Sequence, residues 1–268
     1  MKLRGLGIVL LIIFSVYVIA PVYLMVMVSF SPPQEIIKQH PSLFHLNFTK
    51  EHWRVTFSSG NIWKPLRKSM TVAFYTVLFA LFISIPGAYA LSRLPGKVSM
   101  GLLLLIFFSR MVPEVAIALP ISVTFIRWNL LDTDIGLTMA HLIKVLPITA
   151  WILSGVFKTI PRVLEEASLV DGCSRIGSLL RIVLPLSMPG IAVAAIFSFL
   201  GSWDEFTYAI YLCYAKKTLP LMVYYFANRA NWFLSATYAA MVTIPGVAIT
   251  YSLQKYLKRE YFSGAIKG

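Results

Sequence analysis

The sequence predicts an all-α membrane protein with six transmembrane helices and one short helix in the connection between the fourth and the fifth. Its 268 residues are 58% hydrophobic and only 13% charged, whereas soluble domains carry about 25% charged residues. Stretches without any charged side chain recur along the chain, each long enough to cross about 30 Å of hydrocarbon as a helix. Residues 158–181 form a polar connection that is too long for a simple turn.

The net charge of +13 would also suit a nucleic-acid-binding protein. However, the Lys and Arg residues stand singly between apolar runs and form no basic stripe or arm. Membrane proteins collect cationic side chains in cytoplasmic loops and at the lipid headgroups. The charge therefore indicates a membrane protein, and we expect no nucleic acid as a partner.

Four predicted spans contain no charged residue, because an ionised side chain at the bilayer centre costs at least about 2.5 kcal/mol. They cover residues 5–34, 69–92, 182–203 and 230–254. The first resembles a signal peptide, but it has no A-x-A cleavage site, so we expect it to be retained. The segment between the first two spans is rich in proline and aromatic residues, and predicts either a packed surface loop or aromatic residues at the headgroups.

Two further spans, residues 98–126 and 135–157, are interrupted by Arg110, Glu114 and Lys144. Ionisable groups inside a membrane normally face a protein interior or an aqueous path. Arg110 and Glu114 are four residues apart, which places them on one face of a continuous helix and predicts an ion pair. Structural pairing and a role in a substrate path both stay open.

The polar connection predicts a short helix. Thr159 is a candidate N-cap, Pro161 suits the first turn, and Gly172 supplies a stop. Glu165 and Glu166 lie towards the positive N-terminal end of this helix.

Apolar residues form a stripe along this helix at spacings of four and three: Val163, Ala167 and Val170. We expect the acidic side chains to remain available to a partner: Glu165, Glu166 and Asp171. A helix lying on lipid headgroups is the alternative, but adjacent carboxylates suit an anionic leaflet poorly. Docking to another protein is therefore the preferred interpretation.

The polar connection resembles the EAA loop of ABC importer permeases, because Glu166-Ala167-Ser168, Gly172, Ile182 and Leu184-Pro185 have its spacing. Ser168 stands where the motif has its second alanine. The resemblance implies that the short helix is a cytoplasmic coupling helix seated in a cleft of an ATPase subunit, with both termini cytoplasmic. The charge distribution alone leaves this orientation open. The ATPase-coupling residues implied are Glu165, Glu166, Ala167, Ser168, Asp171, Gly172, Arg175, Ile182 and Pro185.

Three other stretches resemble the second permease of maltose-type carbohydrate importers: residues 130–161, the GSWDEF run at 201–206, and the tail at 263–268. Lys68 and Lys144 depart from that pattern. The resemblance implies a type I ABC importer permease in the plasma membrane of a bacterium or archaeon. It also implies a second permease subunit, an ATP-binding cassette ATPase dimer and an extracytoplasmic solute-binding protein as partners.

On this basis the chain divides into three parts. Residues 1–68 hold the first transmembrane helix and its external loop, residues 69–257 the transmembrane core, and residues 258–268 a cytoplasmic tail.

We expect no enzymatic activity, cofactor or metal in this chain. The phosphate-binding motif G-x-x-x-x-G-K-[ST] is absent, because Gly96-Lys97 is followed by Val98 and Leu91 stands where the first glycine belongs. ATP and Mg are therefore expected on the partner ATPase. No cluster typical of a metal site is formed by the four histidines: His40, His45, His52 and His141.

Candidate residues of a substrate path lie at the end of the fifth span and in the third: Met111, Glu114, Trp203, Asp204, Glu205 and Tyr208. Aromatic faces cover the apolar side of a sugar ring while carboxylates accept hydroxyl protons. Alternatively, Asp204 and Glu205 lie near the external interface and pair with Lys216, Lys217 or a partner subunit.

The function implied is that of a permease subunit of an ATP-driven importer, forming with a partner permease the path for a sugar or oligosaccharide. A permease for another solute, such as a polyamine or a phosphate ester, stays open. An ATP-independent secondary transporter is suggested by the charges inside spans, but the sequence shows no inverted repeat and does carry the EAA spacing.

Overall fold

The computed structural model describes residues 2–38, 44, 47–60 and 62–265, and within them it contains helices and no strands. Five helices there are long and apolar enough to cross a membrane: Gly7–Ser29, Trp63–Arg93, Asp134–Thr159, Arg175–Trp203 and Trp232–Ser252. A bent pair, Gly96–Met111 with Glu114–Arg127, makes a sixth when it is counted as one span. The six predicted spans are thus present, with a break in the third.

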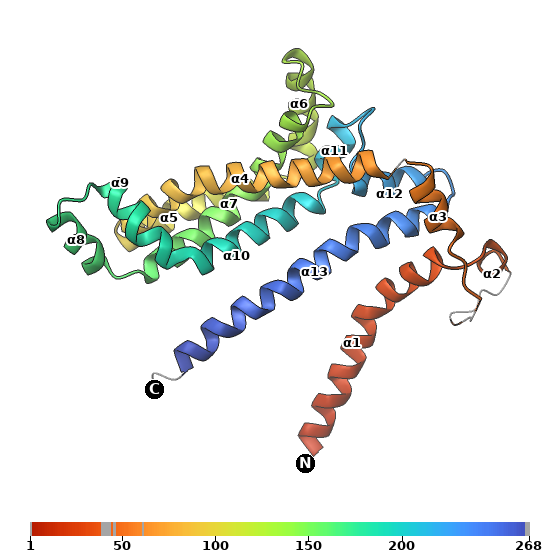
Figure 1. Cartoon of the computed structure of the whole chain (residues 1–268), viewed down its shortest axis with the longest axis horizontal. Helices are drawn as coiled ribbons and strands as arrows, with labels where there is room; N and C mark the ends of the chain where they lie inside the picture. Colours follow the sequence, from red (N-terminus) through yellow and green to blue (C-terminus); the bar gives the residue numbers. More distant parts are fainter. Residues whose placement is uncertain (1, 39–43, 45–46, 61, 266–268) are drawn as a thin grey trace. The chain divides into compact units, whose positions relative to one another are not determined.

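Figure 1 labels the helices in chain order. The long ones are α1 (Lys2–Ser29), α4 (Trp63–Arg93), α5 (Gly96–Phe108), α6 (Glu114–Arg127), α7 (Asp134–Thr159), α10 (Leu184–Trp203) and α13 (Trp232–Ala265). The short ones are α2 (Pro33–Ile36), α3 (Glu51–Ser58), η1 (Ser109–Met111), α8 (Arg162–Val170), α9 (Arg175–Ser178), the π-helical η2 (Leu179–Val183), α11 (Thr207–Leu212) and α12 (Leu219–Ala227).

The third predicted span is not one straight helix. It turns by 81° between η1 and α6. Val112 is extended (φ −73°, ψ 126°), and Pro113 occupies the position before α6. A proline disfavours the helical conformation of the residue before it, which explains why the helix ends here.

This break contradicts the predicted pairing of Arg110 with Glu114 on one helix face. Arg110 lies in η1, before the turn, and Glu114 begins α6 after it. Glu114 instead pairs with Lys144 of α7, with Oε1 and Nζ 3.4 Å apart. The ion pair therefore joins the predicted third and fourth spans.

The chain folds as two compact units, and the first comprises Met1–Leu66 and Lys217–Pro245. The Trp53 ring stacks on Phe30 with centroids 5.2 Å apart, and the His52 ring stacks on Phe233 at 4.8 Å. His52 Nε2 also lies 3.0 Å from the carbonyl oxygen of Ser31. The described part of the segment after α1 is therefore packed, as one of the two interpretations predicted.

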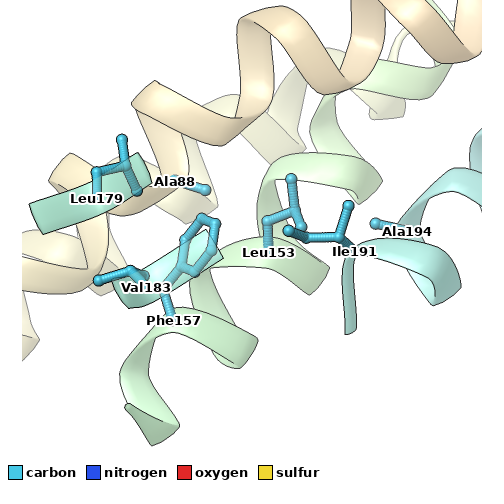
Figure 2. Packing of buried hydrophobic residues seen from close by; sticks show 7 residues of the cluster. All are labelled: Ala88, Leu153, Phe157, Leu179, Val183, Ile191 and Ala194. Carbon is cyan, nitrogen blue, oxygen red and sulfur yellow. The ribbon is translucent and has the colours of Figure 1, made fainter. Parts of the chain in front are cut away.

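The second unit comprises Arg67–Lys216 and Gly246–Gly268. In it α4, α7 and α10 run side by side (Figure 1). Their buried apolar side chains meet at one end (Figure 2), in a cluster made of Ala88, Leu153, Phe157, Leu179, Val183, Ile191 and Ala194. α8 and α9 lie at this end of the three helices, whereas α6 and α11 lie at the other.

α7 begins at a tight turn after α6. The Thr133 hydroxyl accepts a hydrogen bond from the Gly136 amide at 3.0 Å and thereby caps the helix. A Cβ atom at Gly136 would lie 2.2 Å from the carbonyl oxygen of Leu130. Only glycine allows this approach.

Asp132 fastens the same turn to the segment after α11. Its backbone is left-handed (φ 61°), and Lys68 Nζ donates to its carbonyl oxygen at 3.2 Å. Its carboxylate accepts three backbone N–H groups, at 2.8, 2.9 and 3.2 Å, from Tyr214, Ala215 and Lys216. Partial burial raises the pKa of this carboxyl, but the three N–H donors and the nearby Lys68 ammonium outweigh it, so the net pKa is lowered.

We expect Asp132→Asn to lower the free energy of unfolding at pH 7 by about 1 kcal/mol, because the substitution removes the charge that strengthens these hydrogen bonds. The effect is modest because the site is partly exposed. A carboxyl with a lowered folded-state pKa stabilises the protein above its unfolded pKa of about 3.9, and this contribution is lost as the pH falls through the folded pKa. Thermal unfolding of the two proteins in detergent should therefore converge below about pH 4. A difference that is independent of pH would contradict this assignment.

Candidate functional site

The predicted short helix of the polar connection is α8, which begins directly after Pro161. Thr159 is not its N-cap: it is the last residue of α7, and its hydroxyl donates to the carbonyl oxygen of Val156 at 2.7 Å. Ile160 is extended, as expected before proline. Pro161 therefore precedes the first turn of α8 and is not part of it, contrary to the prediction.

α8 ends at Gly172, as predicted. Gly172 has a φ of +86°, which residues with a Cβ rarely adopt. The Cys173 amide donates to the Ser168 carbonyl at 2.9 Å, and the Gly172 amide donates to that of Leu169 at 3.1 Å. These two bonds form a Schellman motif, which satisfies the free carbonyl groups at the helix end.

Glu165 is buried, with 8% of its surface exposed, which corrects the prediction that it is available to a partner. Its carboxylate forms an ion pair with the Arg93 guanidinium at the end of α4. The Tyr89 hydroxyl donates to Glu165 Oε2 at 2.7 Å. The side chain therefore binds α8 to α4.

Two arginines strengthen this junction. Arg93 Nη1 donates to the carbonyl oxygen of Phe157, near the end of α7, at 3.0 Å. Arg162 Nη2, from the first residue of α8, donates to the Arg93 carbonyl oxygen at 3.0 Å. Cationic groups suit helix C-termini because the last carbonyl groups there carry partial negative charge.

The outward side of α8 combines apolar and acidic residues. Val163 and Val170 are 69% and 88% exposed, and Ala167, Glu166 and Asp171 are exposed as well. Ser168 is buried, and its hydroxyl donates to the Glu165 carbonyl oxygen. The apolar stripe is thus on the surface, next to the two acidic residues that remain accessible.

The other predicted coupling residues connect α8 to α10. Arg175 is exposed and begins α9. Ile182 is half-buried in the π-helical segment η2, and Pro185 lies in the first turn of α10, where a missing amide hydrogen is tolerated. Since η2 also contributes Leu179 and Val183 to the buried cluster, this connection is packed against α4, α7 and α10.

The six candidate path residues separate into two groups. Three lie outside the buried interior: Met111 and Asp204 are exposed, and Glu114 is half-buried. The other three are buried, at 2%, 1% and 1% exposed: Trp203, Glu205 and Tyr208. Side chains in the second group face the interior of their own unit, so in this conformation they do not line a surface.

Glu205 is held in a buried polar network with His141, whose importance the sequence analysis missed. His141 Nδ1 lies 2.7 Å from the Ser202 hydroxyl, which donates to Thr76 Oγ1 at 3.3 Å. His141 Nε2 also lies 3.1 Å from Glu205 Oε2. A lone histidine inside an apolar span was the available signal.

The Glu205 carboxylate also fixes the start of α11. It accepts hydrogen bonds at 2.8 and 3.2 Å from the backbone N–H groups of Tyr208 and Ala209. Its contacts are therefore with His141 and α11, which replaces the predicted alternative of pairing with Lys216. Over the described residues, no group of His, Cys, Asp and Glu side chains is arranged to hold a metal ion.

Comparison with known proteins agrees with this architecture. Residues 77–263 match the family model described as "Binding-protein-dependent transport system inner membrane component". The diacetylchitobiose uptake system permease protein DasC of Streptomyces coelicolor is 27% identical over 96% of this chain and 95% of its own. The sulfoquinovosyl glycerol transport system permease protein SmoH of Agrobacterium fabrum is 30% identical, over 82% and 79%.

A solved structure, of a bacterial ABC transporter involved in the import of alginate, has a chain of the same fold. The TM-score is 0.76 with 21% sequence identity, covering 95% of this chain and 96% of that one. The trehalose/maltose transport system permease protein MalG of Thermococcus litoralis is 26% identical over 96% and 94% of the two chains. Because the family model covers more than half of the sequence, the chain belongs to the inner membrane components of binding-protein-dependent transport systems.

Proposed function

We propose that this chain is a permease subunit of an ATP-driven importer and forms, with a partner permease, the path for a sugar or oligosaccharide. The substrate class is supported by the names of relatives that carry diacetylchitobiose, sulfoquinovosyl glycerol and trehalose or maltose. The other partners are an ATP-binding cassette ATPase dimer, which binds ATP and Mg, and an extracytoplasmic solute-binding protein. One of the solved neighbours is an alginate transporter in complex with a periplasmic protein.

The observation that carries the proposal is the construction of α8. This helix has the EAA spacing, an exposed side with Val163, Glu166 and Val170, and a buried side fixed to α4 through Glu165. Such a helix can receive a partner on one side and pass its movement to the membrane on the other. ATP-driven closure of the ATPase dimer would then shift the permeases between states that differ in their affinity for the solute.

For the path itself, the charged side chains at the break of the third span are the best supported contacts. Glu114 and Lys144 pair inside the predicted bilayer, and Asp204 is close enough for its charge to interact with both. Ionisable groups at membrane depth normally face water or protein. Carboxylates and an ammonium can bind hydroxyl groups of a sugar, and Met111 adds an exposed apolar surface beside them.

The decisive experiment compares the assembled complex carrying wild-type chain with one carrying Glu166→Ala plus Gly172→Ala. We expect the complex to assemble and the stimulation of its ATPase by solute-loaded binding protein to fall about tenfold or more, as for loss of a typical coupling free energy between sites. The matched control is Glu51→Ala plus Gly60→Ala, since Glu51 is likewise an exposed glutamate and Gly60 likewise has a positive φ of 67°.

Two results would contradict the proposal. In one, the wild-type chain recruits no ATPase. In the other, both double variants are stimulated to the same extent as the wild type.

A further inference from the structure

We infer that Glu165, Arg93 and Tyr89 form a clamp that couples α8 to α4, so that movement of α8 is passed to a span distant in sequence. This inference rests on the proposed function and adds positioning residues to it. The EAA spacing contains Glu166 but neither Arg93 nor Tyr89. The clamp is defined by these three side chains alone.

The chain itself connects α8 to other spans. Only Ile160 and Pro161 separate it from α7, and residues 171–174 lead from it to α9 and onward to α10. Without side-chain contacts α4 would be linked to α8 only indirectly. Glu165 changes this, because it lies on the inward side of α8 and reaches the last turn of α4, with Arg93 and Tyr89 both bound to its carboxylate.

The clamp is built to hold one geometry. Arg93 binds two acceptors on different elements, the Glu165 carboxylate and the Phe157 carbonyl oxygen near the end of α7. Its guanidinium carbon also lies 5.4 Å from the centre of the Tyr89 ring. The planar guanidinium presents several donors in a fixed arrangement, which an ammonium cannot reproduce.

The position of the clamp favours force transmission over simple adhesion. It lies beside the buried cluster where α4, α7 and α10 meet. Ala88 of that cluster precedes Tyr89 in the chain, and the Phe157 ring contacts the Tyr89 ring. Packed interiors transmit strain because they contain few voids. A displacement of α8 at the clamp would therefore act on all three helices together.

The test is the amount of solute transported per ATP hydrolysed by complexes in vesicles. With Glu165→Gln we expect normal recruitment of the ATPase and normal basal hydrolysis. The amount of solute transported per ATP should fall about fivefold, the lower end of typical coupling effects. Arg93→Lys and Tyr89→Phe should each reduce the ratio in the same direction. The double variant Glu165→Arg plus Arg93→Glu should restore part of it.

The neighbouring Glu166→Gln serves as a matched control, because this side chain is exposed and belongs to the proposed docking surface. It should weaken the affinity for the ATPase without preventing assembly, whereas Glu165→Gln should leave this affinity unchanged. If Glu165→Gln only lowers the yield and each assembled complex transports with the wild-type ratio, the residue is merely structural and the inference is wrong. If the wild-type chain binds no ATPase, the proposed function fails first.

A direct measurement follows the two helices. Spin labels at Leu164 of α8 and Phe82 of α4, both exposed side chains outside the docking side of α8, are attached through cysteines after Cys173 and Cys213 are replaced by alanine. In the wild type the distance between the labels should be the same in nucleotide-free and ATP-trapped complexes. In Glu165→Gln it should differ between these states, and equal distances there would overturn the clamp.

Discussion

Replacing Gly190 by leucine is expected to drive α7 and α10 apart and to leave little correctly assembled protein in the membrane. A Cβ atom at Gly190 would lie 2.4 Å from Cγ2 and 2.5 Å from Cγ1 of Val156. Valine is stiff about χ1 in a helix and has no alternative rotamer of low energy. Overpacking usually costs about 1–3 kcal/mol and occasionally more, and leucine at this contact should reach the upper end.

The yield and thermal unfolding temperature of the purified protein measure this effect. Gly155→Leu is a matched control. Gly155 precedes Val156 in α7, and a Cβ atom there has no neighbour within 4 Å. Gly190→Ala should have a smaller effect, which Val156→Ala should relieve. An unfolding temperature of Gly190→Leu equal to that of Gly155→Leu would show that the two helices do not pack as described.

Removal of the Glu205 carboxylate should strongly lower the stability of the second unit around His141 and the start of α11. Glu205→Ala leaves His141 Nε2 without its neighbouring carboxylate and removes the acceptor of two buried backbone N–H groups at the start of α11. Each buried polar group that is left without a partner costs about 1–3 kcal/mol, and this substitution leaves several. Glu205→Gln retains one acceptor oxygen and should lie between the alanine variant and the wild type.

The adjacent Asp204 provides the comparison, since its side chain is exposed. Asp204→Ala should leave the unfolding temperature near that of the wild type and alter transport instead. Unfolding of the purified complexes, followed by circular dichroism, separates the two effects. If Asp204→Ala is as destabilising as Glu205→Ala, the difference in burial between these neighbours does not determine their roles.

The number and positions of the spans could be predicted from the sequence because the cost of a charge in hydrocarbon is a property of the side chain itself. The break in the third span was missed although Pro113 was visible, since proline occurs in spanning helices both with and without a break. Whether Val112 continues a helix depends on the packing around it. The mistaken pairing of Arg110 with Glu114 followed from the assumption of a continuous helix.

The acidic pair of α8 shows a second limit. Glu165 and Glu166 are adjacent and chemically identical, so composition cannot say which faces the protein. On a helix, adjacent residues point in directions about 100° apart, and the answer comes from Arg93, which lies far away in the sequence. The same holds for Glu205 and Asp204, because only the position of His141 in the folded chain distinguishes them.

The 81° turn between η1 and α6 also constrains how lipid surrounds the protein. Each helix end leaves backbone groups without an intrahelical partner, and hydrocarbon offers them none. Irregular backbone at membrane depth is tolerated only where it is buried in protein or lines a water-filled cavity. Acyl chains therefore cannot form a complete annulus around this subunit. At the corner formed by Val112, another protein chain or water must cover the backbone in place of lipid.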